Sequence, residues 1–232
     1  MEDKKIWDFL LYKLNNPYGV AALMGNLYVE SKLNPKDLQG SYARKLGMTD
    51  DEYTQAVDDG TYSSDKFIHD SAGYGLAQWT HWSRKENLYK YASKCKASIG
   101  DLNMQLNFLW DELQKYKTVV TALMNANNIR EASDIVVKHY EKPTHQEEKY
   151  LASRAKYGQG FYDKFINDDS KFVIATSNVN IRVGNGKEYE KVSLLPKGES
   201  LLWIATAENG WHAVKYDNHV YWVSGEFSYV SP

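Results

Sequence analysis

The sequence predicts a two-domain α+β protein, with a mainly helical domain over residues 1–167 and a small all-β domain over residues 171–232. Two observations support this prediction. Up to about residue 167, apolar residues recur at the three- and four-residue spacing of amphipathic helices. Beyond the polar stretch Asn167–Ser170, the chain consists of short runs rich in β-branched and aromatic residues, separated by turn sequences.

Apolar spacing and capping residues predict the helices. The first helix has one apolar face, and Asn16-Pro17 then supplies the N-cap and the first position of a helix that ends at Glu30. Capping-box sequences predict further helix starts at Thr49, Asn128 and Thr144. A polar helix ends near Cys95. The other helices that we expect cover residues 3–15, 49–57, 101–126, 128–141 and 144–165.

The second domain contains six predicted strands. Turn sequences such as Gly184–Gly186, Pro196–Gly198 and Glu208–Gly210 separate them. A domain of this size built from short strands predicts a small barrel, which has few exposed strand edges. The predicted strands are 172–176, 179–183, 192–195, 200–206, 212–216 and 219–223.

The composition excludes several classes of protein. Hydrophobic residues make up 43% of the 232 residues, and no apolar run reaches the roughly 18 residues that a membrane span needs. The formal net charge of −2 gives no sign of nucleic-acid binding, so we expect neither nucleic acid nor membrane insertion. The first residues are charged and lack an apolar segment, so we expect no signal peptide. A single cysteine excludes an internal disulfide framework.

Glu30 is the most informative residue of the chain. It ends the apolar helical run that begins at Tyr18. A carboxyl group at the C-terminal end of a hydrophobic helix is poorly solvated and faces the negative pole of the helix dipole. Both effects favour the protonated form, which a glycosidase needs in order to protonate a leaving sugar oxygen. Taken alone, the residue is better interpreted as a solvated glutamate near a helix end, and it is the neighbouring segments that reverse this interpretation.

A second segment, Asp70–Arg84, contains groups that suit a saccharide groove. Two glycines within three residues allow a positive φ or a close approach of the backbone to a ligand. Gln78 offers both hydrogen-bond donors and acceptors. The flat apolar faces of Tyr74, Trp79 and Trp82 match the C–H faces of sugar rings. The alternative is a glycine-rich turn followed by a tryptophan in the core.

Together, the segments Gly25–Pro35 and Gly73–Thr80 resemble the bacteriophage tail lysozyme family. They are similar, more distantly, to goose-type lysozymes and lytic transglycosylases, whose motifs read Glu-Ser and Gly-Leu-Met-Gln. The resemblance implies a lysozyme-like fold, Glu30 as the catalytic acid and Gln78 as a substrate-binding residue in a cleft. The separation of Glu30 from Gln78 is longer than in goose-type enzymes, and we interpret the extra stretch as a small helical insertion.

A second catalytic carboxylate is expected for an inverting hydrolase but not for a lytic transglycosylase. An inverting hydrolase needs one to position water, and Asp70 is the best candidate because goose-type enzymes carry an aspartate shortly before the glycine-rich loop. Asp70 precedes Gln78 by one residue fewer than in their usual pattern. In a lytic transglycosylase Glu30 would act first as acid and then as base, and the 6-hydroxyl of muramic acid would close a 1,6-anhydro ring.

The step His139–Pro143 is a further candidate border of the cleft. An aromatic-acid-x-Pro sequence recurs at about this place in the tail lysozyme family, which implies a substrate-binding role for Tyr140 and a place beside the cleft for Glu141. The alternative is the end of a helix, with Tyr140 in the core and Glu141 in solvent.

Other catalytic chemistries find little support. Cys95 lies in the C-terminal half of a polar helix, and no histidine has a recognisable spacing to it, so a thiol nucleophile is not expected. The six histidines show no zinc-binding pattern, and we expect no metal and no cofactor.

The second domain resembles bacterial SH3-type (SH3b) domains over Phe172 to Tyr229. The sequences Asn178–Gly184, Asn209–Lys215 and Tyr221–Val223 carry this resemblance. It implies binding to the cell wall, often to the peptide part of peptidoglycan. A structural cap or a dimerisation module is the alternative. The domain has many aromatic residues for its size, and we expect some of them to line a groove: Trp203, Trp211, Tyr216, Tyr221 and Trp222.

The sequence as a whole therefore predicts a modular peptidoglycan hydrolase of the phage endolysin type. We expect it to cleave the β-1,4 bond between N-acetylmuramic acid and N-acetylglucosamine. The expected location is the host cytoplasm before lysis, with action at the bacterial cell wall. Three rivals remain open: a lytic transglycosylase, a wall-binding protein without activity, and an amidase or peptidase that acts through Cys95.

Overall fold

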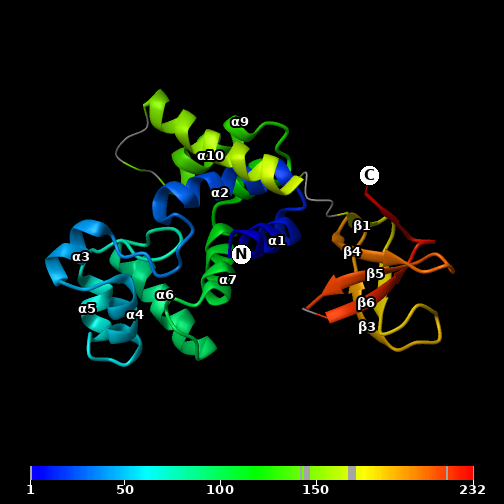
Figure 1. The fold of residues 1–232 in the computed structure, drawn as a ribbon, viewed down its shortest axis with the longest axis horizontal. Helices are drawn as coiled ribbons and strands as arrows, with labels where there is room; N and C mark the ends of the chain where they lie inside the picture. The colour runs from blue at the N-terminus through cyan, green and yellow to red at the C-terminus, as the bar shows by residue number, and fades with distance from the viewer. Residues whose placement is uncertain (1, 142, 144–146, 167–170, 218, 232) are drawn as a thin grey trace. The chain divides into compact units, whose positions relative to one another are not determined.

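The computed structural model describes residues 2–141, 143, 147–166, 171–217 and 219–231 (Figure 1). The chain divides into two compact units, Met1–Tyr162 and Asp163–Pro232. The first unit is mainly helical, and the second carries a seven-stranded antiparallel sheet. The predicted α+β class is therefore confirmed.

The helices of the N-terminal part follow one another through short connections. A π-helix, η1 (Val137–Glu141), directly continues α9. The α-helices are α1 (Glu2–Leu14), α2 (Pro17–Ser31), α3 (Gly40–Leu46), α4 (Asp50–Asp58), α5 (Ser64–His69), α6 (Trp82–Cys95), α7 (Leu102–Leu113), α8 (Lys117–Met124), α9 (Ile129–Val136) and α10 (Glu148–Ile166).

Helix α2 lies at the centre of this unit, among α1, α8, α9 and α10 (Figure 1). As predicted, Asn16 caps it by accepting a hydrogen bond from Gly19, and Pro17 is its first residue. Gly25 and Gly158 let α2 and α10 come unusually close. A Cβ atom at Gly25 would lie 2.4 Å from the backbone oxygen of Arg154, so a side chain there would push the two helices apart.

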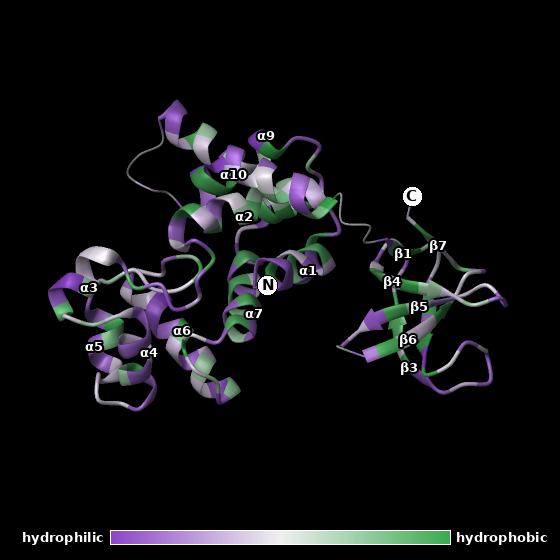
Figure 2. Cartoon of the chain, viewed as in Figure 1, coloured by the Kyte–Doolittle hydropathy of each residue, from purple (hydrophilic) through white to green (hydrophobic). Residues whose placement is uncertain are grey.

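Helices α3, α4, α5 and α6 gather in a separate group of the same unit (Figure 1). Hydrophilic and hydrophobic segments alternate along α6 and α10, as expected for amphipathic helices (Figure 2). The predicted capping box of α4 is present: Thr49 accepts from the backbone N–H of Glu52, and the Glu52 carboxylate accepts from that of Thr49. The insertion predicted between Glu30 and Gln78 is thus helical, with α3 and α5 in addition to the expected helix.

The prediction of one long helix over 101–126 is wrong, because this stretch forms two helices, α7 and α8, separated by residues 114–116. The N–H groups of Lys115 and Tyr116 bond to carbonyls three residues back, which tightens the backbone out of the α-helix. The ring of Tyr116 packs edge-on against Tyr140, with ring centroids 5.2 Å apart. A tertiary contact thus interrupts an apolar pattern that runs on through the break.

The two following helices also differ from the prediction. The helix expected over 128–141 changes from α to π at Val137. The capping box predicted at Thr144 lies outside the described residues, and α10 begins at Glu148 in the described chain. The last helix ends at Ile166, one residue beyond the predicted end.

The C-terminal sheet has the strand order β3-β2-β6-β5-β4-β1-β7, and all its pairs are antiparallel. Each predicted strand matches an observed one to within one residue at either end, but the sequence prediction missed β7. Its core contains eight buried apolar residues, among them Val173, Ile181 and Val223. The strands are β1 (Phe172–Ala175), β2 (Val179–Arg182), β3 (Lys191–Leu195), β4 (Ser200–Thr206), β5 (Trp211–Tyr216), β6 (His219–Ser224) and β7 (Ser228–Val230).

None of the helices in the described part of the chain is long and apolar enough to cross a membrane.

Candidate active site

Glu30 lies in the last turn of α2, as predicted, with about a fifth of its side chain exposed. Its Oε1 accepts a 2.6 Å hydrogen bond from Nη2 of Arg154 on α10. Arg154 is largely buried, since only 8% of its side chain is exposed. The carboxyl group of Glu30 thus has a specific cationic partner, which the sequence pattern did not indicate.

Residues next to Glu30 in the sequence hold this arrangement in place. Asn26 lies one helical turn before Glu30 on the same face of α2, and its Oδ1 accepts from Nη1 of Arg154 at 3.3 Å. Ser31 donates from Oγ to the backbone oxygen of Leu76 at 2.9 Å. Ser31 therefore joins the end of α2 to the glycine-rich loop, so that the Glu-Ser and Gly-Leu-Ala-Gln sequences form one structural unit.

The two glycines of that loop are explained by close contacts inside the protein. Gly75 has φ +74°, and a Cβ there would lie 2.7 Å from Oε1 of Gln105. The same Oε1 accepts from the backbone N–H of Leu76, while Nε2 of Gln105 donates to the carbonyls of Pro35 and Ile99. Gln105 is fully buried, and its hydrogen bonds join the loops that contain Pro35, Leu76 and Ile99. Sequence analysis missed this residue, which looks like an ordinary helical glutamine.

Gln78 is partly exposed and binds Asp37. Its Nε2 donates to the carboxylate and the backbone oxygen of Asp37, at 2.9 and 3.0 Å. Burial raises the pKa of Asp37 to about 6, with a smaller contribution from the charge of Asp50, while Lys32 opposes the shift. Asp37 is a second half-buried carboxylate near the motif, and no local pattern in the sequence singled it out.

The backbone around these groups adopts sparsely populated conformations. Lys32 and Leu33, directly after α2, have φ values of +55° and +63°, and Gln78 has φ +44°. Non-glycine residues seldom adopt this region, and such strain is often found at functional sites. Lys32 and Leu33 lie between Glu30 and Asp37 in the sequence, and Gln78 lies in the glycine-rich loop.

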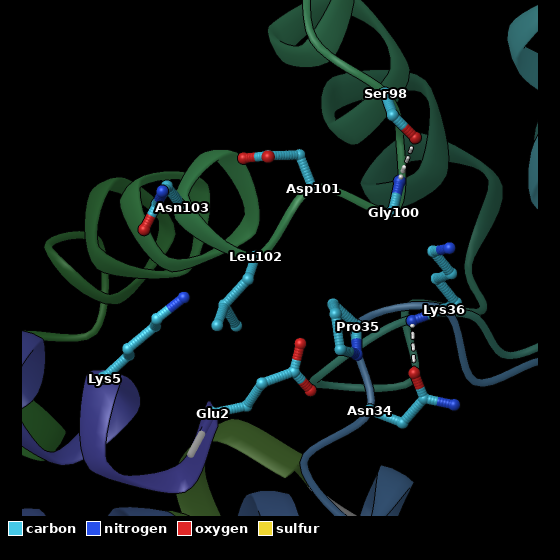
Figure 3. Close-up of a pocket in the computed structure, with 10 residues that line it drawn as sticks. All are labelled: Glu2, Lys5, Asn34, Pro35, Lys36, Ser98, Gly100, Asp101, Leu102 and Asn103. Carbon is cyan, nitrogen blue, oxygen red and sulfur yellow. Dashed lines mark hydrogen bonds between the residues drawn. The ribbon is translucent and has the colours of Figure 1, made fainter.

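A pocket of about 560 Å³ lies elsewhere, where the start of α1 meets the loops at residues 34–36 and 98–103 (Figure 3). Its described lining mixes acidic and basic side chains, including Glu2, Lys5, Lys36 and Asp101. None of the predicted site residues is part of that lining: Glu30, Asp70, Tyr74, Gln78, Trp79 and Tyr140.

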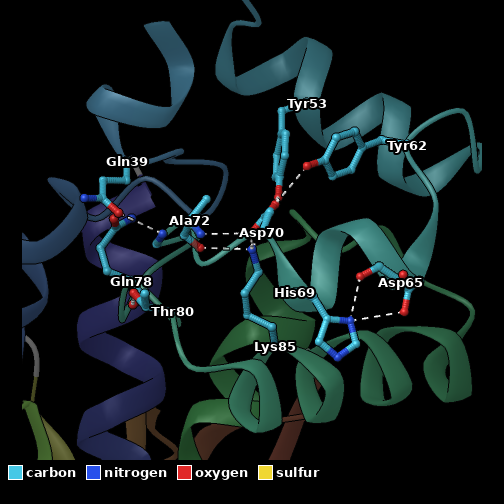
Figure 4. A network of polar contacts seen from close by, with 11 residues as sticks. Gln39, Tyr53, Tyr62, Asp65, His69, Asp70, Ala72, Gln78, Thr80 and Lys85 are labelled. Carbon is cyan, nitrogen blue, oxygen red and sulfur yellow. Dashed lines mark hydrogen bonds and ion pairs between the residues drawn. The ribbon is translucent and has the colours of Figure 1, made fainter. Parts of the chain in front are cut away.

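Asp70, the predicted second carboxylate, is held by several donors (Figure 4). Lys85, which is fully buried, donates to its Oδ1, as does the backbone N–H of Ala72. Tyr53 and Tyr62 donate to its Oδ2. Burial lowers the pKa of Lys85, and the hydrogen bond to Asp70 opposes this shift. With only 8% of its side chain exposed, Asp70 has the environment of a structural ion pair, so its catalytic role stays a prediction.

The aromatic residues of the motif divide into core and surface. Tyr74 and Trp79 have no exposed area; Tyr74 shares a hydrogen bond with Thr54, and Trp79 donates to Glu112. Neither ring can touch a saccharide in this structure, which corrects their predicted substrate contacts. Trp82, at the start of α6, is the exposed aromatic residue of this segment: 52% of it is accessible, although its ring also lies near those of His69 and His81.

Tyr140 is also a core residue, 3% exposed, so its predicted substrate contact is likewise corrected. Its hydroxyl donates to Oε2 of Glu112 at 2.6 Å and accepts from Arg84. Arg84 donates twice to the Glu112 carboxylate, at 2.9 and 2.7 Å. Burial alone would raise the pKa of Glu112, but the hydrogen bonds from Arg84, Tyr140 and Trp79 lower it overall.

Glu141 follows Tyr140 at the end of the π-helix. The residue is partly exposed, yet its Oε1 atom is buried without a hydrogen-bond partner in the described structure. Burial raises the pKa of Glu141 to about 8, and the negative charge of Glu30 adds to the shift, whereas Arg84 and Arg154 oppose it. Because the charge of Glu30 acts on Glu141, the two carboxyl groups lie within electrostatic range of each other. The aromatic-acid-x-Pro step was the signal that pointed to it.

Cys95 is the candidate nucleophile of the amidase or peptidase alternative. Cys95 is exposed at the last residue of α6, far from the helix N-terminus that would stabilise a thiolate.

No curated protein matches the chain. The model of the phage tail lysozyme family matches residues 2–165, which comprise most of the chain and contain Glu30, the glycine-rich loop, Glu141 and Arg154. The chain therefore belongs to the phage tail lysozyme family.

Proposed function

We propose that the protein is a peptidoglycan hydrolase that cleaves the β-1,4 bond between N-acetylmuramic acid and N-acetylglucosamine, with Glu30 as the general acid. Family membership suggests peptidoglycan-degrading activity of a glycoside hydrolase. The observation that carries the residue assignment is the partly exposed carboxyl group of Glu30 at the end of α2, joined by Ser31 to the glycine-rich loop.

The chemistry follows from the position of the carboxyl group. Glu30 donates a proton to the glycosidic oxygen, and the bond from the anomeric carbon to that oxygen breaks with its electron pair going to the oxygen. Arg154 orients the carboxyl group through Oε1, and we assign the proton transfer to Oε2. After bond cleavage the carboxylate of Glu30 remains paired with the guanidinium group, which stabilises its negative charge.

For a hydrolase that inverts, we propose Asp37 as a second candidate beside Asp70 for positioning water. Such a carboxylate stands about 6.5–9.5 Å from the acid. Asp37 is half-buried and held by Gln78, whereas both carboxylate oxygens of Asp70 are already engaged by donors from the protein. If the enzyme is instead a lytic transglycosylase, neither aspartate is needed for the chemistry.

The products distinguish these reactions. Mass spectrometry of the muropeptides released from purified peptidoglycan, without borohydride reduction, should show free reducing muramic acid ends. Fragments lighter by one water, with 1,6-anhydro ends, would identify a transglycosylase. Release of free stem peptides alone would contradict the proposal and point to an amidase or peptidase.

The role of Glu30 is tested by Glu30→Gln, which keeps the shape of the side chain and removes the acid. We expect turnover to fall by about 10²–10⁴-fold, because this is the usual loss when a general acid is removed. Glu131→Gln, at an exposed position on α9, is the matched control and should keep full activity. Normal turnover by folded Glu30→Gln would end the assignment.

We propose further that the C-terminal sheet domain is an SH3b-type module that binds the cell wall. Its partly buried aromatic residues Trp203, Tyr216 and Tyr221 pack against the core, and three apolar residues are exposed on β3 and β6: Val192, Leu194 and Val220. Wall binding would raise the local substrate concentration for the catalytic domain. With such a module, the chain would act as a phage endolysin that accumulates in the host cytoplasm and reaches the wall at lysis.

The targeting role is tested by truncation after residue 166. Activity of the shortened protein on intact cell walls should fall well below that of the full chain, while its activity on soluble glycan fragments should be retained. Equal losses on both substrates would contradict a targeting role.

A further inference from the structure

The starting observation is the unpartnered oxygen of Glu141. Among the described residues, its Oε1 is the only buried side-chain nitrogen or oxygen atom without a hydrogen bond. Buried polar atoms are nearly always paired, so an exception calls for a cause, and a functional role is one of the usual causes. Glu141 also ends a π-helix, a rare element that is often found at functional sites.

The charges around Glu141 come from four helices. Glu30 on α2 and Glu112 on α7 carry negative charges; Arg84 on α6 and Arg154 on α10 carry positive ones. Arg84 is already paired with Glu112, and Arg154 with Glu30. Both cations are therefore balanced before Glu141 is counted. A third carboxylate in this place would be an uncompensated buried charge, which is costly, whereas a protonated carboxyl group adds none.

The direction in which the pKa of Glu141 shifts agrees with this count of charges. Burial is the main cause that raises the pKa of Glu141, and the charge of Glu30 adds to it.

We infer that Glu141 is a positioning residue of the proposed reaction, which together with Glu30 holds one proton at neutral pH, and that this shared proton reaches the leaving sugar oxygen through Glu30. The inference rests on the proposed glycosidase function. It explains how the site keeps a proton available although the carboxyl group of Glu30 is paired with Arg154. Glu141 stores the proton, and Glu30 delivers it.

The proton balance closes over one turnover. The pair begins with one proton and gives it to the glycosidic oxygen, while the bond to the anomeric carbon breaks and its electrons go to that oxygen. Water, or the sugar's own 6-hydroxyl, then forms a bond to the anomeric carbon. The proton that the water or the 6-hydroxyl loses returns to the pair, directly in a transglycosylase and by way of the aspartate that activates water in an inverting hydrolase, and the pair is again ready.

The test compares the pH dependence of muropeptide release by the wild-type protein and by Glu141→Gln, between pH 5 and pH 9, on purified peptidoglycan. We expect the variant to match the wild type within about threefold at pH 5 and to lose about tenfold in relative rate for each pH unit above its own alkaline limb, which lies lower than that of the wild type. Glu141→Asp, which keeps a carboxyl group, should retain part of the alkaline activity, and Glu131→Gln should follow the wild type throughout.

Two results would overturn the inference. Superimposable pH profiles would mean that Glu141 does not hold the proton. A loss that is uniform at every pH would mean that Glu141 has only a structural role, and thermal unfolding of each variant at pH 7 shows whether a fold defect accounts for it.

A measurement that needs no turnover separates this inference from the proposed function. In protein labelled with ¹³C at the glutamate carboxyl carbons, the resonance that is missing from Glu141→Gln should titrate near pH 8 in the wild type. Titration in the ordinary glutamate range, about pH 4, would refute the shared proton even if the protein is a glycosidase. If that resonance titrates near pH 8 and yet no muropeptides are released, the proposed function is wrong. The inference that Glu141 and Glu30 together hold a proton at neutral pH would then still be supported.

Discussion

Arg154 donates a 2.6 Å hydrogen bond to Glu30 from a helix 124 residues further along the chain. The contact depends on the close approach of α2 and α10 at Gly25 and Gly158. It gives the site a fixed cation beside the proposed acid. The same helix pair brings Asn26 to Nη1, the other terminal nitrogen of the guanidinium group. Asn26 and Glu30, on one face of α2, therefore set the orientation of Arg154.

Arg154→Gln should therefore affect both stability and activity. The pair is intermediate between exposed pairs, worth about 0–1 kcal/mol, and buried pairs, whose disruption costs about 3–5 kcal/mol. We expect the free energy of unfolding to fall by about 2 kcal/mol in urea titrations. Turnover should fall as well, because the carboxyl group of Glu30 loses the donor that orients it.

A double-mutant cycle with Glu30→Gln isolates the pair from other effects of the substitution. The two single changes should not add, because either one removes the same interaction. Strictly additive losses of stability would show that the ion pair contributes nothing measurable.

Trp82→Ala should weaken substrate binding. Trp82 is the exposed aromatic residue of the motif segment, and an aromatic contact is worth about 0.5–1.5 kcal/mol, which corresponds to a roughly 2- to 12-fold rise in KM. The measurement is the rate of release from soluble glycan oligomers as a function of their concentration. Tyr12→Ala, at a similarly exposed aromatic on α1, is the control; a KM for Trp82→Ala equal to that of the control would remove Trp82 from the site.

Features set by neighbouring residues were predictable from the sequence. The cap at Asn16, the capping box at Thr49 and the position of Glu30 at the end of α2 all depend on groups a few residues apart. Short runs of β-branched and aromatic residues between turn sequences likewise predicted six strands. The strand at Ser228–Val230 was missed, because a three-residue strand has too few positions to show a periodic pattern.

Features set by distant residues were not predictable. Arg154 reaches Glu30 only because two glycines bring their helices together. Trp79 looks like a sugar-binding aromatic in sequence, but a buried carboxylate, Glu112, accepts from its indole N–H and draws the ring into the core. Periodicity also cannot distinguish one helix from two when Tyr116 fits the same apolar stripe across the break.

Asp70→Asn tests whether Asp70 is structural. The change leaves Lys85 buried without its counter-charge, so the free energy of unfolding should fall by about 3–5 kcal/mol, as for other broken buried pairs. Turnover per folded molecule, measured well below the midpoint of thermal unfolding, should stay within about threefold of the wild type. A stable Asp70→Asn protein whose turnover falls by about 10²-fold or more would instead restore Asp70 as the second catalytic carboxylate.

Asp37→Asn is the complementary experiment. If Asp37 positions water, turnover should fall by about 10²–10⁴-fold, with little change in stability because Gln78 keeps its bond to the backbone oxygen of residue 37. The acid limb of the wild-type rate profile should lie near pH 6, since burial raises the pKa of Asp37 to about that value and water is activated by the carboxylate form. Full activity of Asp37→Asn would fit a transglycosylase, in which no second carboxylate takes part.

The contribution of Glu141 to the stability of the wild-type protein should fall as the pH rises from about 4 to about 8. Burial raises the pKa of Glu141 to about 8 in the folded protein, whereas an unfolded glutamate titrates near 4.3. Within this window the folded state binds the extra proton, so the contribution of Glu141 is complete below the lower value and is lost as the pH passes through the upper one. Urea unfolding at pH 5, 7 and 9 measures the slope.

Glu141→Gln removes the contribution of Glu141 to the pH dependence of the free energy of unfolding. The contributions of other residues with raised pKa values remain. The raised pKa of Asp37 also lowers stability with rising pH, but it is present in both proteins, so the difference between them isolates Glu141. We expect the variant to become the more stable of the two at pH 9, because the wild type must then bury a charge beside Glu30 while the neutral amide does not. Parallel stability curves for the two proteins would show that Glu141 does not keep its proton on folding, and the site would have no acid beyond Glu30 itself.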